Sequence, residues 1–314
     1  MSASAAQARF DEGTKLITRT SLWADWQRGM ALIEQASRDG VPEASERSAV
    51  FHCMGIGKPI DWPRALDLLV LAAEQGSARA AEELSLMAGG DRSSSPRDLR
   101  SAISLEQLFS APPVQLLSMT PRIGIIKQFA SPEECRWLIE SARDRLEPAT
   151  IFDPETGALR PDPNRTNRAV RCDPLESGLM VEVIRARLAN AIGLPLTQFE
   201  VSQILHYAVG EQFWPHHDYF NTDRPSFQKE IAAGGQRIAT QLIYLNEEYE
   251  GGATQFPDLG FEYRGGTGDS LMFFNINERG DAEPLTLHCG LPPTSGDKWT
   301  FSQWIRDRQP APRS

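Results

Sequence analysis

The segment LHYAVGEQFWPHHDYF, residues 205–220, holds three of the five histidines of this 314-residue chain. Its aromatic residues suit a strand, and in an extended chain successive side chains point to opposite faces. His216 and Asp218 then share one face, whereas His217 points to the other. The segment therefore offers an imidazole and a carboxylate to one point in space.

Two histidines and one carboxylate on one side of a metal suit non-haem iron(II), because they leave positions open for a bidentate co-substrate and for dioxygen. The third ligand must come from a later segment, and His288 is the only histidine that follows His217. Lys298 comes ten residues after His288 and opens the next strand-like segment. A cation there could neutralise the far carboxylate of a dicarboxylic co-substrate.

Short segments rich in β-branched and aromatic residues continue from Glu200 onward, separated by Gly, Pro and Asp. They read EVSQILHYAV, RIATQLIYL, DSLMFFN, PLTLHCG and KWTFSQWI, and such a series predicts an all-β sandwich or roll. Two helices are expected upstream, at 178–192 and at 131–145, where Ser131 is a suitable N-cap. The predicted fold class is α+β, with supporting helices leading into a double-sheet roll.

From about Arg122 to Ile305 the chain resembles the prolyl 4-hydroxylase-like iron(II)- and 2-oxoglutarate-dependent oxygenases. The resemblance rests on motifs in the family's order: RTN at 165–167, the segment 205–220, GQRIATQLIYLNEEYEGGATQFP at 235–257, GDSLMFF at 268–274 and LHCGLPPTSGDKWTFSQWI at 287–305. It implies that the roll is a double-stranded β-helix, or jelly roll, which forms the catalytic core.

The resemblance implies that His216, Asp218 and His288 bind the iron. It also implies that Lys298 binds the 5-carboxylate of 2-oxoglutarate. Asp218 separates the chain from the halogenases of this superfamily, which have a small residue at that position and so leave room for halide.

Three further side chains receive roles from the resemblance alone. Tyr207 is similar to the tyrosine that hydrogen-bonds the co-substrate, and Thr240 is expected to line the same pocket. Arg165 lies where the family has an RTS-like segment, on a loop that closes over a peptide substrate. Asn167 stands in place of the serine of that segment, so we expect the substrate contacts to differ.

The reaction implied by the resemblance is hydroxylation of an unactivated C–H, coupled to oxidative decarboxylation of 2-oxoglutarate to succinate and carbon dioxide. Iron(II), 2-oxoglutarate and dioxygen are then required, with ascorbate as a reductant. The leading substrate is a prolyl side chain of a peptide or protein. Two alternatives stay open: the same chemistry on a free amino acid or small metabolite, and a non-catalytic interaction protein. The intact ligand set and Lys298 argue against the second alternative.

The chain before about residue 90 is rich in Ala, Leu, Glu and Arg at helical spacing, which predicts helices. A faint internal repeat with a period of 36 residues predicts stacked helix pairs; it relates Ile33, Ala36, Gly40 and Ala44 to Leu69, Ala72, Gly76 and Ala80.

The stretch DWPRALDLLVLAAEQGSARA at 61–80 resembles a Sel1-type repeat, a relative of the tetratricopeptide repeat. A small helical cap packed on the second domain is the alternative. The segment GGDRSSSPR at 89–97 has the composition of a flexible linker. We expect a helical repeat domain over residues 1–110 and the catalytic domain over residues 111–314.

The formal net charge of −10 argues against a broad nucleic-acid surface. No apolar run approaches the roughly 18 residues that span a bilayer, and the first residues lack the apolar core of a signal peptide. The resemblance implies a peptide or protein partner, whereas charge and hydropathy predict no nucleic acid and no membrane; the oligomeric state stays open. A cytoplasmic location with reduced thiols is predicted from four scattered cysteines: Cys53, Cys135, Cys172 and Cys289.

Some residues near the expected ligands have ordinary structural interpretations. Strand alternation turns His206 and His217 away from the metal. Core packing is expected for most of the flanking aromatic residues Trp214, Tyr219 and Phe220.

Overall fold

The computed structural model describes residues 3–19, 22–90, 93–153, 155–156 and 158–309. Its internal contacts divide the chain into two compact units. The helical unit contains Met1–Ser110 together with Asp173–Leu188, and the sheet unit contains Ala111–Cys172 together with Ala189–Ala311.

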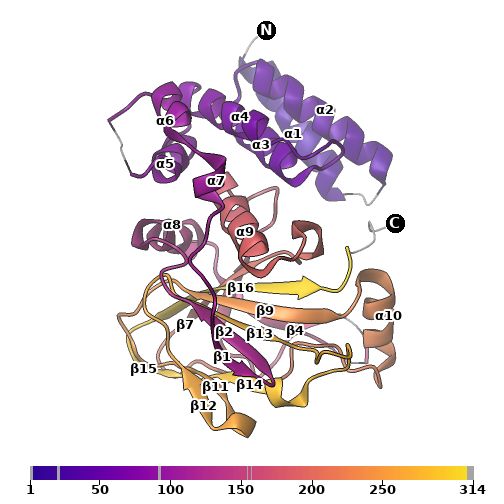
Figure 1. Cartoon of the computed structure of the whole chain (residues 1–314). Helices are drawn as coiled ribbons and strands as arrows, with labels where there is room; N and C mark the ends of the chain where they lie inside the picture. The colour runs from indigo at the N-terminus through magenta and orange to yellow at the C-terminus, as the bar shows by residue number, and fades with distance from the viewer. Residues whose placement is uncertain (1–2, 20–21, 91–92, 154, 157, 310–314) are drawn as a thin grey trace. The chain divides into compact units, whose positions relative to one another are not determined.

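The helical unit is built from consecutive short helices (Figure 1). Their bounds are α1 Ala3–Arg19, α2 Trp23–Arg38, α3 Pro42–Met54, α4 Trp62–Glu74, α5 Ala78–Met87, α6 Pro96–Ala102 and α7 Leu105–Leu108. Side-chain caps define several starts: the carboxylate of Asp61 accepts the Arg64 N–H at the start of α4, and the hydroxyl of Ser77 accepts the Ala80 N–H at the start of α5.

The 36-residue sequence repeat corresponds to two successive helix–turn–helix pairs, α2–α3 and α4–α5. Gly40 and Gly76 occupy the two turns with φ of 95° and 103°, values that favour glycine. Small and apolar residues of the repeat, such as Ala36 and Ala72, are fully buried. The predicted helix pairs are therefore confirmed, whereas their assignment to the Sel1 class stays a prediction.

The described residues of the segment 89–97, which was expected to be a flexible linker, belong to the helical unit, and residues 91 and 92 lie outside the described residues. Helix α6 begins at Pro96, where the hydroxyl of the N-cap residue Ser95 accepts a hydrogen bond from the Asp98 N–H. Ion pairs from α6 to α4, including Arg100 with Asp67, tie the two helices together. Composition alone did not reveal this return of the chain.

Helix α9 (Leu179–Ile192) follows strands in the sequence, yet its residues up to Leu188 belong to the helical unit. The catalytic domain expected from the sequence, residues 111–314, includes this segment. Two hydrogen bonds explain the difference: the buried carboxylate of Glu83 accepts the Leu179 N–H, and the Leu108 carbonyl accepts the Arg187 guanidinium N–H, each at 3.0 Å.

The larger sheet of the sheet unit has eight antiparallel strands (Figure 1). In spatial order they are β1 Gln115–Met119, β2 Arg122–Ile126, β13 Ser270–Phe274, β9 Arg237–Tyr244, β16 Lys298–Arg306, β7 Gln203–Tyr207, β6 Arg168–Arg171 and β3 Glu147–Pro148.

A smaller four-stranded sheet carries two of the predicted metal ligands. Its order is β12 Phe261–Tyr263, β11 Thr254–Phe256, β14 His288–Gly290 and β8 Phe213–His216. Two-stranded ribbons and short helices complete the unit: β4 Thr150–Phe152 with β5 Leu159–Pro161, β10 Glu250–Gly251 with β15 Pro293–Ser295, α8 Pro132–Arg143, α10 Pro225–Gly234, and single 3-10 turns at Leu196–Gln198, Pro257–Leu259 and Pro284–Thr286.

A hydrophobic cluster joins the two sheets. Phe256 of β11 packs edge to face against Phe273 of β13, with ring centroids 5.2 Å apart. Antiparallel sheets with supporting helices agree with the predicted α+β class and with a jelly-roll core. Helix α8 also begins as predicted, because Ser131 and Glu134 form a capping box.

The four cysteines are buried, and the cytoplasmic location stays a prediction. Among the described residues, no helix has the length and apolar character needed to cross a bilayer.

Candidate metal centre

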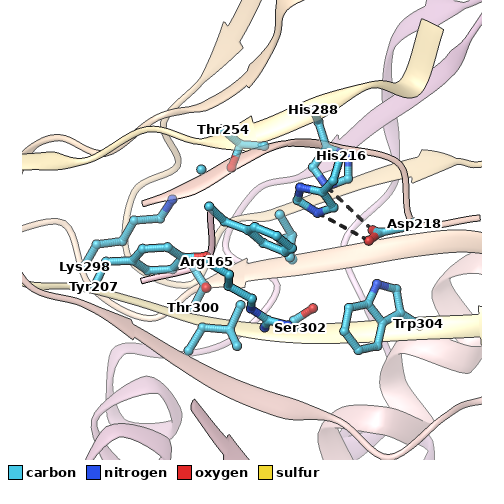
Figure 2. Close-up of a pocket in the computed structure, with 14 residues that line it drawn as sticks. Arg165, Tyr207, His216, Asp218, Thr254, His288, Lys298, Thr300, Ser302 and Trp304 are labelled. Carbon is cyan, nitrogen blue, oxygen red and sulfur yellow. Dashed lines mark ion pairs between the residues drawn. The ribbon is translucent and has the colours of Figure 1, made fainter. Parts of the chain in front are cut away.

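The three predicted ligands meet at the adjacent strands β8 and β14, where His216 and His288 are direct register partners. The Nε2 atom of His216 lies 3.6 Å from Oδ1 of Asp218, and Nε2 of His288 lies 3.6 Å from Oδ2 (Figure 2). One ligand atom from each residue lies within 4.8 Å of the other two. Strand β8 ends at His216, so Asp218 reaches the cluster from the segment that follows the strand.

Both imidazoles are prepared to bind a metal through Nε2. The Nδ1 atom of His216 lies 2.8 Å from the Trp214 carbonyl, and that of His288 lies 3.0 Å from the Thr286 carbonyl. A carbonyl oxygen only accepts hydrogen bonds, so each Nδ1 carries the proton and each Nε2 keeps a free lone pair. Backbone acceptors of this kind fix the orientation of histidine ligands. The donor set therefore fits a divalent metal.

The charges in the cluster also favour metal binding. Burial lowers the pKa of His288 to about 4, with the neighbouring His216 acting in the same direction, so this imidazole is neutral at pH 7. Burial opposes ionisation of Asp218, but His288, His216 and Arg237 hold its pKa well below the ordinary value. The cluster thus presents the neutral imidazole of His288 and the carboxylate of Asp218, forms that a metal requires.

The three predicted ligands line one side of a pocket. Its walls come from β7, β8, β9, β11, β14 and β16 (Figure 2). The lining residues are Arg165, Leu205, Tyr207, Phe213, His216, Asp218, Leu242, Thr254, His288, Gly290, Lys298, Thr300, Ser302 and Trp304.

Lys298 places a buried ammonium in the pocket, with 2% of the residue exposed. Among the described residues no carboxylate pairs with it; its nearest ring is that of Tyr207, whose centroid is 5.1 Å from Nζ. Burial lowers the pKa of Lys298 to about 7. A buried cation without a counter-ion is suited to receive an anion from a ligand.

Tyr207 lies directly opposite Lys298 in the register of β7 and β16. Burial raises the pKa of Tyr207 to about 12, so its hydroxyl remains a hydrogen-bond donor at neutral pH. Thr254 on β11 completes this end of the pocket and was missed by the sequence analysis. The sequence gave no reason to assign a role to Thr254, the one hydroxyl residue of the stretch GGATQFP.

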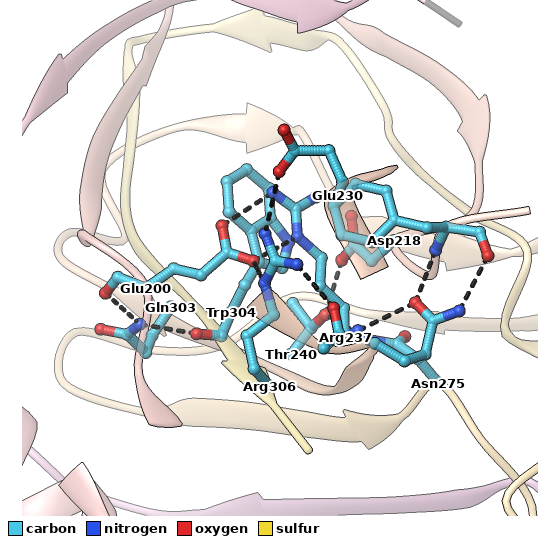
Figure 3. Close-up of polar contacts among 12 residues, drawn as sticks. Glu200, Asp218, Glu230, Arg237, Thr240, Asn275, Gln303, Trp304 and Arg306 are labelled. Carbon is cyan, nitrogen blue, oxygen red and sulfur yellow. Dashed lines mark hydrogen bonds and ion pairs between the residues drawn. The ribbon is translucent and has the colours of Figure 1, made fainter. Parts of the chain in front are cut away.

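Thr240 lies behind Asp218 rather than in the pocket wall, which differs from the prediction. Its hydroxyl is 2.6 Å from Oδ2 of Asp218 and 2.9 Å from Nδ2 of Asn275 (Figure 3). Strand β9 turns this side chain towards the carboxylate.

Arg165 lies between strands β5 and β6, and its side chain lines the pocket with 6% exposed. Its guanidinium donates to the Thr150 carbonyl, to Asn167 and to Gln203, and it lies over the Phe213 ring, 4.6 Å from the centroid. All of these hydrogen-bond partners are neutral. Arg165 therefore brings a second buried positive charge to the pocket.

A buried ion network supports the wall at Trp304 (Figure 3). The carboxylate of Glu200 accepts from Arg237 and from Arg306. The Arg237 guanidinium also lies 3.9 Å from the centroid of the Trp304 ring. None of these residues was singled out from the sequence.

His206 and His217 make contacts outside the metal cluster. His206 pairs with Asp297 at 3.2 Å, and Nε2 of His217 lies 2.9 Å from the Pro284 carbonyl. Phe220 is buried as expected, but Trp214 is 53% exposed, so core packing was the wrong expectation for this side chain.

Comparisons with known proteins agree with this geometry. The model of the 2OG-Fe(II) oxygenase superfamily matches residues 202–306. Prolyl 4-hydroxylase 1 of Arabidopsis thaliana is 32% identical over 208 residues, which cover 62% of this chain and 72% of that protein. Probable prolyl 4-hydroxylase 6 of the same plant is 34% identical over 221 residues, with 64% and 75% covered.

Among solved structures, the viral collagen prolyl hydroxylase of Paramecium Bursaria Chlorella virus-1, in complex with 2OG, is 26% identical, with a TM-score of 0.45 over 58% of this chain and 94% of that chain. The extent and level of identity to the plant proteins show the family. The chain belongs to the prolyl 4-hydroxylase-like 2OG-Fe(II) oxygenases, dioxygenases that require iron(II), 2-oxoglutarate and dioxygen.

Proposed function

We propose that this enzyme hydroxylates a prolyl side chain of a peptide or protein, with iron(II) held by His216, Asp218 and His288. The observation that carries the proposal is that this cluster and the unpaired ammonium of Lys298 line one pocket. When bound, iron(II) with 2-oxoglutarate supplies the oxidising power that activates dioxygen for C–H hydroxylation.

The protein's own residues orient the co-substrate. Lys298 would receive the far carboxylate of 2-oxoglutarate, and the Tyr207 hydroxyl would donate a hydrogen bond to it. Burial of both groups excludes water from this end of the pocket, which strengthens the charge pairing.

Prolyl substrates are supported by the curated relatives, whose names describe prolyl 4-hydroxylases. Arg165 offers donors near Phe213 to a substrate carbonyl. The exposed ring of Trp214, two residues before His216, is suited to contact a peptide. The helical unit would help to recruit that protein substrate, as Sel1-type repeats would suggest.

The test uses the full-length enzyme with iron(II), 2-oxoglutarate and ascorbate. We expect proline-containing peptides to gain the mass of one oxygen atom, with one succinate released per hydroxylation, while peptides with Ala in place of Pro gain none. Asp218→Ala should abolish both products, whereas Asp258→Ala, which changes an exposed aspartate in a 3-10 turn, should retain them. Hydroxylation of free proline but of no peptide would contradict the proposed substrate class.

A further inference from the structure

Buried hydrogen bonds connect Asp218 through Thr240 to Asn275 (Figure 3). Oδ2 of Asp218 lies 2.6 Å from the Thr240 hydroxyl, which lies 2.9 Å from Nδ2 of Asn275. The three residues are 5%, 1% and 0% exposed, so water does not compete with these hydrogen bonds. Thr240 comes from β9, and Asn275 directly follows β13, the neighbouring strand.

The direction of the hydrogen bonds is fixed by the chemistry of the groups. The amide of Asn275 donates to the Thr240 oxygen, and a hydroxyl has a single proton to give. That proton is therefore directed at Oδ2 of Asp218, an ionised carboxylate that can only accept. A hydrogen bond to a charged acceptor is short and strong, in agreement with the 2.6 Å separation.

Both carboxylate oxygens of Asp218 are within reach of a metal in the cluster. Oδ1 lies 3.6 Å from Nε2 of His216, and Oδ2 lies 3.6 Å from Nε2 of His288. A bidentate carboxylate would occupy one more coordination position than a monodentate one. Such a position is needed by a co-substrate that itself binds through two atoms.

We propose that Thr240, held by Asn275, is a positioning residue that occupies Oδ2 of Asp218 and leaves Oδ1 as the metal-binding oxygen. This inference rests on the proposed metal ligation by Asp218. Thr240 keeps the carboxylate monodentate and thereby keeps a coordination position free for 2-oxoglutarate. The contact with substrate or co-substrate is made by other residues.

The test compares Thr240→Val, which removes the hydroxyl at similar volume, with Thr240→Ser, which retains it. The purified full-length chain is loaded with Co(II), whose visible absorption reports coordination number. Binding of 2-oxoglutarate to this form is measured by calorimetry without turnover. We expect Thr240→Val to change the absorption spectrum and to weaken 2-oxoglutarate binding by about tenfold or more, and Thr240→Ser to resemble the wild type.

Ser270→Ala provides a matched structural control. Ser270 on β13 accepts a buried hydrogen bond of 2.9 Å from Gln241, the neighbour of Thr240 on β9. Its loss should lower the unfolding temperature but leave the Co(II) spectrum unchanged. Asn275→Ala, which keeps the hydroxyl but removes its anchor, should change the spectrum in the same direction as Thr240→Val and serves if that variant does not fold.

The outcomes separate this inference from the proposed function. If Asp218→Ala loses Co(II) binding while folded Thr240→Val and Asn275→Ala keep the wild-type spectrum and 2-oxoglutarate affinity, the positioning role is wrong and the metal site stands. If Asp218→Ala binds Co(II) as tightly as the wild type, the proposed ligand set itself is wrong.

Discussion

Replacing Lys298 with Met should make the protein more stable and less able to bind its co-substrate. No carboxylate of the described part of the chain pairs with the buried ammonium of Lys298, and burial lowers its pKa from 10.5 to about 7. A pKa lowered by folding means that the unfolded chain binds more protons, so the lysine opposes folding below pH 10.5. Methionine fills a similar volume without the charge.

The pKa values set the size of the effect. At about 1.4 kcal/mol per pH unit, the gap between 10.5 and about 7 places a ceiling of about 5 kcal/mol on the gain in unfolding free energy from Lys298→Met. The gain should be full below pH 7 and should disappear as the pH rises towards 10.5. Loss of a charge-assisted hydrogen bond of about 1.5–3 kcal/mol should weaken 2-oxoglutarate binding about 10- to 100-fold.

The assay combines urea unfolding at several pH values with calorimetry of 2-oxoglutarate binding to the Mn(II)-loaded enzyme. Lys229→Met serves as the control, because Lys229 is exposed on α10 and the same substitution there should change neither quantity. If Lys298→Met is less stable than the wild type at pH 6 and binds 2-oxoglutarate equally well, the interpretation of Lys298 as an uncompensated anion-binding charge is refuted.

Two further predictions concern the helical unit. Burial raises the pKa of Glu83 from 4.5 to about 8, so its contribution to stability is full below pH 4.5 and is lost as the pH rises through 8. Glu83→Gln should therefore remove up to about 5 kcal/mol of pH-dependent unfolding free energy. Unfolding free energies of variant and wild type that change with pH in parallel would show this to be wrong. A fragment of residues 111–314 should be poorly soluble and less stable than the full chain. The reason is that it exposes the apolar side chains of α9 that are buried in the helical unit. A soluble fragment with an unchanged unfolding temperature would contradict the assignment of α9 to that unit.

The metal cluster was accessible from sequence because its geometry is largely local. The two-residue period of an extended chain predicted that His216 and Asp218 face one way, and the supply of histidines left His288 as the partner. Strand β8 in fact ends at His216, yet Asp218 reaches the cluster from the segment that follows. The same period along β16 places Lys298, Thr300, Ser302 and Trp304 in the pocket wall. Once Lys298 was chosen, this pattern could have identified the other three residues as well.

The supporting contacts were not accessible in the same way. Thr240 and Asn275 are 35 residues apart and meet Asp218 only because β9 and β13 are neighbours in the folded sheet. The place of α9 in the helical unit likewise depends on a buried carboxylate, Glu83, whose partner Leu179 is 96 residues away. Periodicity within one segment contains no information about such pairings.

The most direct test of the metal centre is anomalous X-ray diffraction from crystals of the full-length enzyme soaked with Mn(II). One strong anomalous peak is expected within about 2.0–2.3 Å of Nε2 of His216, Nε2 of His288 and a carboxylate oxygen of Asp218, distances typical of such ligands. A manganese peak elsewhere in the protein, with this cluster empty at saturating Mn(II), would contradict the proposed ligand set.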